Sequence, residues 1–294
     1  MGEPVFGRML TAMVTPFDDE GQLDLPTARK LAAHLVDDLC NDGLVISGTT
    51  GEGPTTSDAE KRALLVAVKE EVGDRAKIVA GVGTNDTAHS VELARQAEQA
   101  GADGLLVVTP YYSLPPQQDI IDHFVAVADA TQLPMALYDI PHRTGRAIAT
   151  DSLITLAKHP RIRAVKDAKK DLDASSRVMA ETDLDFYSGD DAITLALMAI
   201  GGVGVVGTST HFSGRPVHRM IDAFLAGDNA EALRLHRVLL PVFMGVFATQ
   251  GCLMVKAALA HQGLPVGTCR PPLSAAPPDL AERFAAILDA TDLS

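Results

Sequence analysis

Hydrophobic residues in this chain fall into short runs rich in β-branched residues, separated by longer segments with helical periodicity. The runs predict eight strands: Met9–Val14, Leu44–Ser47, Lys77–Ala80, Leu105–Val108, Met135–Tyr138, Ile162–Lys166, Asp185–Ser188 and Val203–Val206. These runs are apolar throughout instead of alternating with polar residues, as is typical of strands covered on both faces. The pattern therefore predicts a buried parallel sheet.

The segments between the runs place apolar residues on one face at helical spacing. They predict helices over Thr27–Leu39, Asp58–Glu71, Ala88–Gln99, Asp119–Thr131, Asp151–Lys158, Leu172–Thr182 and Ala192–Ile200. A parallel sheet with such crossovers is either doubly wound or closed into a barrel. The count of eight strands and their even spacing favour the (β/α)8 TIM barrel.

The residues after the last strand predict only helices. These run to about Ala226 and then over Asn229–Phe247, Cys252–Gln262 and Pro278–Asp289, with a proline-rich connector at 270–278. We therefore divide the chain into a barrel core, residues 1–213, and a second part, residues 214–294, within the same structural unit. The second part holds the last barrel helix and a C-terminal helical extension.

Composition narrows the classes of function. The 294 residues carry a formal net charge of -13, which argues against nucleic acid or an anionic membrane surface as a partner. The longest apolar stretch, Leu239–Ala248, is too short to span a bilayer, and the N-terminus lacks the features of a secretory signal. The three cysteines fit neither a disulfide framework nor a metal pair. We expect a cytoplasmic protein.

Residues suited to carbonyl chemistry follow the predicted strands, at the edge where (β/α)8 enzymes place their active sites. The strand ends carry Gly48-Thr49-Thr50-Gly51-Glu52-Gly53, Thr109-Pro110-Tyr111-Tyr112, Tyr138-Asp139-Ile140-Pro141-His142-Arg143-Thr144-Gly145, Lys166, and Gly189-Asp190-Asp191. Hydroxyls, phenols, one lysine and one arginine thus converge on one rim. Such a set is typical of chemistry on an anionic carbonyl compound.

Lys166 is the most informative of these residues. Burial disfavours the ammonium form, and a partly neutral lysine is the nucleophile that forms a Schiff base with a ketone. Taken alone, a lysine at a strand end is more often one that reaches solvent or forms an ion pair. Its neighbours at the other strand ends favour the catalytic interpretation.

Other motifs have simpler explanations. The glycine-rich loop after the second strand lacks the Lys-Ser/Thr ending of a phosphate-binding loop, and the tyrosine pair could pack at the barrel rim. Gly202–Gly207 matches GxGxxG, but its glycines fall within a strand, which argues against a dinucleotide site. The histidines show no metal-ligand spacing, so we predict no metal. Asp190 and Asp191 are read as a helix N-cap and a first-turn acid.

These motifs resemble the dihydrodipicolinate synthase family, within the superfamily of pyruvate-dependent class I aldolases that includes N-acetylneuraminate lyase. The resemblance rests on Gly48–Glu52, Val108–Tyr112, Tyr138–Gly145, Val165-Lys166-Asp167 and Ser188–Asp191. Two features favour the synthases over the sialic acid lyases. They are the paired threonines Thr49-Thr50 and the arginine of Arg143-Thr144-Gly145.

The resemblance implies condensation of pyruvate with L-aspartate 4-semialdehyde to 4-hydroxy-tetrahydrodipicolinate, in lysine and diaminopimelate biosynthesis. Lys166 would form the Schiff base, which needs no cofactor, and Tyr138 would shuttle protons through Thr49 and Tyr112. Substrate would be held by Thr50, Arg143, Val206 and Gly189. The resemblance also implies that the relay tyrosine comes from a neighbouring subunit, so we expect a homodimer or homotetramer.

Some positions depart from the family pattern. The last strand reads Gly204-Val205-Val206-Gly207-Thr208 where a serine is usual at Gly207, and Lys166 precedes Asp167-Ala168-Lys169-Lys170 instead of Glu-Ala-Thr-Gly. These differences leave open a paralogous aldolase or dehydratase acting on a sugar-derived 2-keto acid. A barrel that only binds a keto acid, as a sensor, is the alternative outside enzymes.

The resemblance also bears on feedback regulation. Many family members are inhibited by lysine at a site that Asn85 and Tyr111 match here. His89 replaces the glutamate of lysine-sensitive members, and Lys61 replaces a histidine. Because free lysine needs a carboxylate partner and is repelled by an ammonium group, we predict weak inhibition or none.

Overall fold

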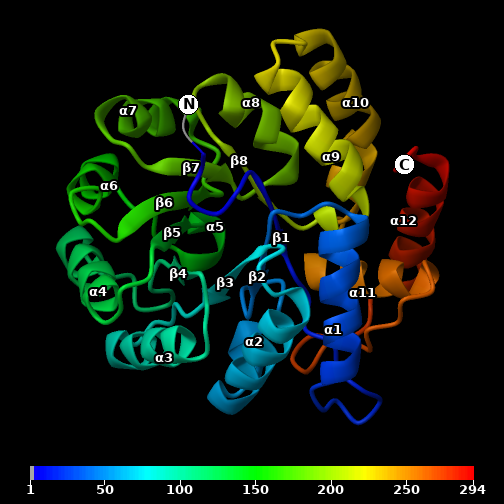
Figure 1. Cartoon of the computed structure of the whole chain (residues 1–294), viewed down its shortest axis with the longest axis horizontal. Helices are drawn as coiled ribbons and strands as arrows, with labels where there is room; N and C mark the ends of the chain where they lie inside the picture. The colour runs from blue at the N-terminus through cyan, green and yellow to red at the C-terminus, as the bar shows by residue number, and fades with distance from the viewer. Residues whose placement is uncertain (1–2) are drawn as a thin grey trace.

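A closed ring of parallel strands forms the centre of the molecule. The computed structural model describes residues 3–294, and Figure 1 shows the strands enclosed by helices. The strands are β1 (Met9–Ala12), β2 (Gly43–Ile46), β3 (Lys77–Gly81), β4 (Gly104–Val108), β5 (Met135–Asp139), β6 (Ile162–Asp167), β7 (Asp185–Ser188) and β8 (Gly204–Gly207). Each strand pairs in parallel with the next, and β8 pairs with β1. The predicted (β/α)8 barrel is confirmed.

Helices follow the strands around the outside of the barrel (Figure 1). They are α1 (Leu25–Ala33), α2 (Asp58–Val72), α3 (Thr87–Gln99), α4 (Gln117–Asp129), α5 (Pro141–Thr144), α6 (Thr150–Leu156), α7 (Leu172–Glu181) and α8 (Thr194–Ala199). A π-helical segment, η1 (His34–Asp38), continues α1, and the 3₁₀ turns are η2 (Gly53–Thr55) and η3 (Asp191–Ile193). A capping box formed by Ser57 and Glu60 begins α2.

The C-terminal part is helical, as predicted. It consists of α9 (Thr210–Leu225), α10 (Asn229–Gly245), α11 (Gly251–His261) and α12 (Pro278–Ala290), which occupy the same side of the barrel as α1 in Figure 1. One apolar cluster joins Leu31 of α1 with Met254 of α11 and Phe284 of α12. The division proposed at residues 213 and 214 falls inside α9, where Ser213 departs from helical geometry.

Two apolar layers position the site. Alternate strand residues, such as Val79, Ala136 and Ala164, fill the inside of the barrel, and Tyr138 belongs to the same cluster. Most of the other apolar strand residues face the helices and belong to the larger outer cluster, and Met9 and Val205 belong to a third cluster. Because side chains alternate along a strand, the residue after each inward-facing one points to the helices. No helix of residues 3–294 combines the length and apolar character that a membrane crossing requires.

The first strand is shorter than predicted. It ends at Ala12 instead of Val14, because the Val14 N–H turns away from the sheet and donates to Nε2 of His211, 3.2 Å away. Burial lowers the pKa of His211 to about 4, so the ring is neutral and its Nε2 is free to accept this bond. A buried histidine thus replaces the neighbouring strand as the hydrogen-bond partner.

Other differences occur at helix ends. The first helix begins at Leu25 instead of Thr27, because Asp24 caps it and Pro26 fits its first turn. The short helix α5 was not predicted, since its four residues are too few to show periodicity. Pro141 begins it, and Gly145 ends it with a left-handed φ of 77°.

The interpretation of the GxGxxG motif is confirmed. Gly204–Gly207 form β8, and not a turn between a strand and a helix. A Cβ atom at Gly204 would lie 1.8 Å from the carbonyl oxygen of Arg8, in the segment leading to β1. These glycines therefore allow two neighbouring strands to approach, and they do not form a phosphate-binding loop.

Candidate active site

Lys166 occupies the carboxyl end of β6 and is almost completely buried, with 5% of its surface exposed. Burial lowers its pKa from 10.5 to about 8; the carboxylate of Asp191 opposes this change, and Arg143 adds to it. Its Nζ lies 4.4 Å from the centre of the Tyr138 ring. The side chain is therefore an amine that is readily deprotonated, beside a phenol.

Tyr138 lies opposite Lys166 in the pairing of β5 with β6. Burial raises the pKa of its phenol to about 12, and the Arg143 charge and the Thr49 hydroxyl both oppose that rise. At neutral pH the phenol is therefore protonated. It can give a proton to a nearby oxygen, but it needs a partner to return the proton.

The loop after β2 brings Thr49 and Thr50 to the same end of the barrel. Thr49 lines a cavity together with Tyr138 and Arg143. The hydroxyl of Thr50 lies 3.5 Å from that of Thr208, which follows β8. Ser47 and Glu52, on either side of these threonines, have left-handed φ angles of 56° and 54°. Backbone of this kind is uncommon outside glycine and is frequent in functional loops.

Arg143 belongs to α5, directly after β5, and its side chain is exposed. Its Nη2 donates a hydrogen bond of 2.7 Å to Oε1 of Gln250, the N-cap residue of α11. The C-terminal helices therefore reach the same site as the strand ends. A guanidinium held in this way can bind a carboxylate through two parallel hydrogen bonds.

Gly189 and Val206 lie at the ends of β7 and β8. A Cβ atom at Gly189 would lie 3.2 Å from Cγ of Lys166 and 2.9 Å from Cβ of Ala168. Glycine therefore leaves room for the lysine side chain. Val206 is buried at 5% exposure within the inner apolar cluster.

Asp191 has a role at this site that the sequence did not predict. As predicted, Asp190 caps η3 and Asp191 is the acidic residue of its first turn. Asp191, however, is buried at 2% exposure and accepts backbone hydrogen bonds from Thr208 and Ser209. It thereby fixes the turn after β8. Burial raises the pKa of Asp191 itself, and in its ionised form its charge opposes the fall in the pKa of Lys166. This role could not be predicted from the sequence, because Asp191 meets Thr208 and Ser209 only when β7 and β8 are paired in the fold.

Tyr112 is the one predicted site residue that points away from the others. Its side chain is 90% exposed, although it is a large aromatic residue. Its φ is 74°, in the left-handed region that bulky residues rarely adopt. Nothing within the described chain brings its hydroxyl to Thr49 or Tyr138.

The cavity in this end of the barrel has a volume of about 390 Å³. Of the predicted site residues, its walls include Thr49, Tyr138 and Arg143, whereas Lys166 and Thr50 lie outside its lining. The cavity extends outward past a second group of residues: Tyr111, Asn85, His89, Lys61 and Asp58. Nε2 of His89 lies 3.0 Å from a carboxylate oxygen of Asp58.

Among residues 3–294, no group of three or more histidine, cysteine or acidic side chains is arranged to hold a metal ion. The lysine, the phenol, the hydroxyls and the guanidinium are the reactive groups that the barrel end brings together. The fold and this site define a (β/α)8-barrel enzyme with one buried lysine at the carboxyl end of its strands.

The chain belongs to the Dihydrodipicolinate synthetase family, whose pattern it matches over residues 5–291. The 4-hydroxy-tetrahydrodipicolinate synthase of Cutibacterium acnes is 60% identical over 293 residues, which cover 100% of both chains. That of Acidothermus cellulolyticus is 63% identical over 91% of this chain and 87% of its own. The crystal structure of the synthase of Cyanidioschyzon merolae with lysine bound superposes with a TM-score of 0.97, at 39% identity, over 99% of this chain and 100% of that one.

Proposed function

We propose that this chain is a lyase that condenses pyruvate with L-aspartate 4-semialdehyde to 4-hydroxy-tetrahydrodipicolinate, in the biosynthesis of lysine and diaminopimelate. Membership of the family and the names of its relatives support this reaction. The observation that carries the proposal is the buried amine of Lys166, with a pKa of about 8, beside the Tyr138 ring.

The amine of Lys166 attacks the ketone carbon of pyruvate, and loss of water leaves an imine. Loss of a methyl proton gives an enamine, whose carbon attacks the aldehyde and forms the new carbon–carbon bond. The aldehyde oxygen takes up a proton and becomes a hydroxyl group. The amine of the second substrate then attacks the imine carbon, closes the ring and releases Lys166. The lysine supplies the covalent chemistry, so the reaction requires no metal or cofactor.

The remaining residues hold the substrates and move protons. Thr50 and the backbone amides of its loop bind the pyruvate carboxylate, and donors fixed by a folded loop do so with little reorganisation. Tyr138 donates and recovers protons, and its high pKa makes the relay through Thr49 and Tyr112 necessary. Arg143 binds the carboxylate of the aldehyde substrate. The imine forms beside Gly189 and the backbone carbonyl oxygen of Val206.

The relay requires a second copy of the chain. We propose a homodimer, alone or paired into a homotetramer, in which Tyr112 of each subunit enters the site of the other. The 90% exposure of this tyrosine and its left-handed backbone support the proposal, because a lone chain gives such a conformation no compensating contact. Sedimentation of the purified chain tests this proposal, and a monomer, as in one related synthase variant, would refute it.

Reductive trapping tests the covalent step. Cyanoborohydride in the presence of pyruvate should add the mass of pyruvate less one oxygen atom to Lys166. Lys166→Ala should take up no label and show no turnover, whereas Lys170→Ala, which changes an exposed lysine nearby, should take up the label in full. Labelling of Lys166→Ala would refute the assignment. Absence of label from the wild-type chain would favour a barrel that only binds a keto acid.

The alternative of a sugar-acid substrate depends on the pocket wall at Gly207. A Cβ atom there would lie 2.8 Å from the Asp191 carboxylate and 2.9 Å from Cγ2 of Thr210. Neighbouring side chains therefore already fill the space that a serine would take, so the glycine does not widen the site for a larger substrate. A coupled assay with pyruvate, aspartate semialdehyde and the next reductase distinguishes the two substrates directly.

A further inference from the structure

Glu52 is a buried charge with no role in the reaction described above. Its side chain is 1% exposed, and its Oε1 lies 2.7 Å from Nζ of Lys256 in α11, whose side chain is 4% exposed. Its Oε2 accepts a hydrogen bond of 2.8 Å from the backbone N–H of Arg270. A residue of the loop after β2 is thus bound at both oxygens by the C-terminal part of the chain.

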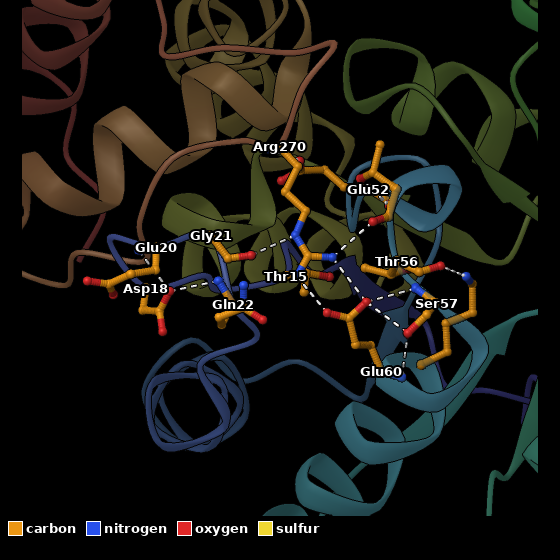
Figure 2. A network of polar contacts seen from close by, with 12 residues as sticks. Thr15, Asp18, Glu20, Gly21, Gln22, Glu52, Thr56, Ser57, Glu60 and Arg270 are labelled. Atoms are coloured by element: carbon orange, nitrogen blue, oxygen red, sulfur yellow. Dashed lines mark hydrogen bonds and ion pairs between the residues drawn. The ribbon is translucent and has the colours of Figure 1, made fainter.

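The two cationic residues are themselves held in place. Nζ of Lys256 donates to the carbonyl of Thr268 at 2.9 Å, and both cations lie over the ring of Phe17, at 4.3 Å for Lys256 and 4.1 Å for Arg270. Figure 2 shows Arg270 between Gly21, Glu52 and Glu60. Its guanidinium donates to the carbonyl of Gly21 at 2.8 Å and to both carboxylate oxygens of Glu60. These contacts form a fixed frame around Glu52.

Backbone hydrogen bonds connect Glu52 to the other residues of the substrate loop, the Gly48–Gly53 turn that carries Thr49 and Thr50. The N–H of Glu52 donates to the carbonyl of Thr49 at 3.2 Å, and the N–H of Gly53 donates to that of Gly48 at 3.0 Å. The Thr15 hydroxyl donates to the carbonyl of Gly51 at 2.6 Å. A change in the left-handed backbone of Glu52 would therefore turn the peptide groups that carry Thr49 and Thr50.

A stabilising role alone does not explain an ion pair at this place. Burying two charges costs desolvation, and apolar residues of similar size are often equally stable in their place. The pair with Lys256 holds Glu52 by charge attraction, and the hydrogen bond from the Arg270 N–H to the other oxygen, which an apolar side chain could not accept, fixes the direction of the carboxylate. The pair joins a substrate loop to a separate part of the fold, 204 residues further along the chain by the residue numbers.

We propose that Glu52 is a positioning residue for the keto-acid carboxylate, and that its contacts with Lys256 and Arg270 hold the Gly48–Gly53 turn in the binding geometry. The inference rests on the proposed function, because it takes the carboxylate of pyruvate as the group bound by that turn. It assigns the C-terminal extension a part in binding the first substrate. Arg143 and Gln250 serve the second substrate.

The test compares Glu52→Gln with Glu60→Gln in the full-length protein. Both changes replace a carboxylate that binds the Arg270 segment, but only Glu52 belongs to the substrate loop. We expect Glu52→Gln to raise KM for pyruvate about tenfold, as for loss of one oriented charge contact, and to change KM for aspartate semialdehyde less than about twofold. Glu60→Gln keeps an amide oxygen that can accept from the Arg270 guanidinium, so it should raise KM for pyruvate less than about twofold.

The double variant Glu52→Gln with Lys256→Met separates an effect on pyruvate binding from an effect on the stability of the fold. It also provides a test if Glu52→Gln alone fails to fold. It leaves no unpaired buried charge, so its melting temperature should return toward that of the wild type, while KM for pyruvate stays raised. Recovery of both quantities would overturn the proposal, and so would equal increases in both KM values. Loss of the trapped adduct from the wild-type chain would instead refute the proposed function itself.

Discussion

The neutral amine of Lys166 should set the pH dependence of imine formation. Burial lowers its pKa from 10.5 to about 8. At pH 7 about one molecule in ten then carries the neutral amine, against about one in three thousand for an ordinary lysine. The reactive form is therefore enriched roughly 300-fold. The corresponding free-energy cost of burying the charged form is about 3 kcal/mol.

The assay is the initial rate of adduct formation with subsaturating pyruvate and cyanoborohydride, followed by intact mass from about pH 6 to about pH 11. The rate should rise with pH and reach half of its maximum near pH 8, because only the neutral amine attacks the ketone. A midpoint at or above about pH 10, the range of an exposed lysine, would refute the reasoning from burial.

Asp191 provides an internal check on the same titration. Its carboxylate raises the pKa of Lys166, so Asp191→Asn should move the midpoint to lower pH. Asp190→Asn is the matched control, because Asp190 pairs with the exposed Lys170 at 2.6 Å and caps η3. A shift of the same size in both variants would mean that the effect is not specific to the buried carboxylate.

Four further outcomes are expected. Lys166→Met should raise the free energy of unfolding near neutral pH by up to about 3 kcal/mol, measured by urea denaturation. Because the folded pKa lies below the unfolded one, this gain is complete below about pH 8 and disappears as pH rises through about 10.5. Arg143→Ala should raise KM for aspartate semialdehyde about tenfold to a hundredfold, as for loss of a charge-assisted contact of about 1.5–3 kcal/mol, and should raise KM for pyruvate far less. Equal effects would make Arg143 structural. Tyr112→Phe should slow turnover without changing the oligomer measured by sedimentation, and normal turnover would remove its hydroxyl from the relay. Free lysine should inhibit weakly or not at all in the coupled assay, since Lys61 and His89 line the outer cavity. Inhibition at about 1 mM or below, an affinity near -4 kcal/mol, would contradict that expectation.

Periodicity was sufficient to predict the fold. Strands buried on both faces are apolar throughout, so all eight were found in the sequence within a few residues of their observed ends. The same reasoning placed Lys166 and Tyr138 at one end of the barrel, where they are paired across β5 and β6. Their contact follows from topology, because parallel neighbouring strands end at the same edge.

Contacts between distant segments could not be predicted in this way. Gln250 lies 107 residues from Arg143, and Glu52 meets Lys256 only after the C-terminal helices have packed against the barrel. Periodicity says which face of a helix is buried, but not which loop its first residue will meet. The resemblance predicts that His89 removes a carboxylate from the lysine site, whereas the structure places Asp58 beside His89 in the same cavity. A carboxylate is therefore present, although the imidazole engages it.

The residues that follow Tyr138 and Lys166 in sequence show how the helix-facing side of the sheet supports the groups inside the barrel. Asp139 and Asp167, each next in sequence to Tyr138 and Lys166, are buried and paired with one another in the strand register. Lys169 lies 3.7 Å from the Asp139 carboxylate and 3.3 Å from that of Asp167, and it approaches the ring of Phe186 in the outer cluster. Because side chains alternate along a strand, the two carboxylates and Lys169 lie on the helix-facing side of the sheet, while the phenol and the amine face the barrel interior. A slip of one residue between β5 and β6 would separate both pairs at once, so the outward-facing carboxylates and their lysine hold the register on which the amine–phenol contact depends.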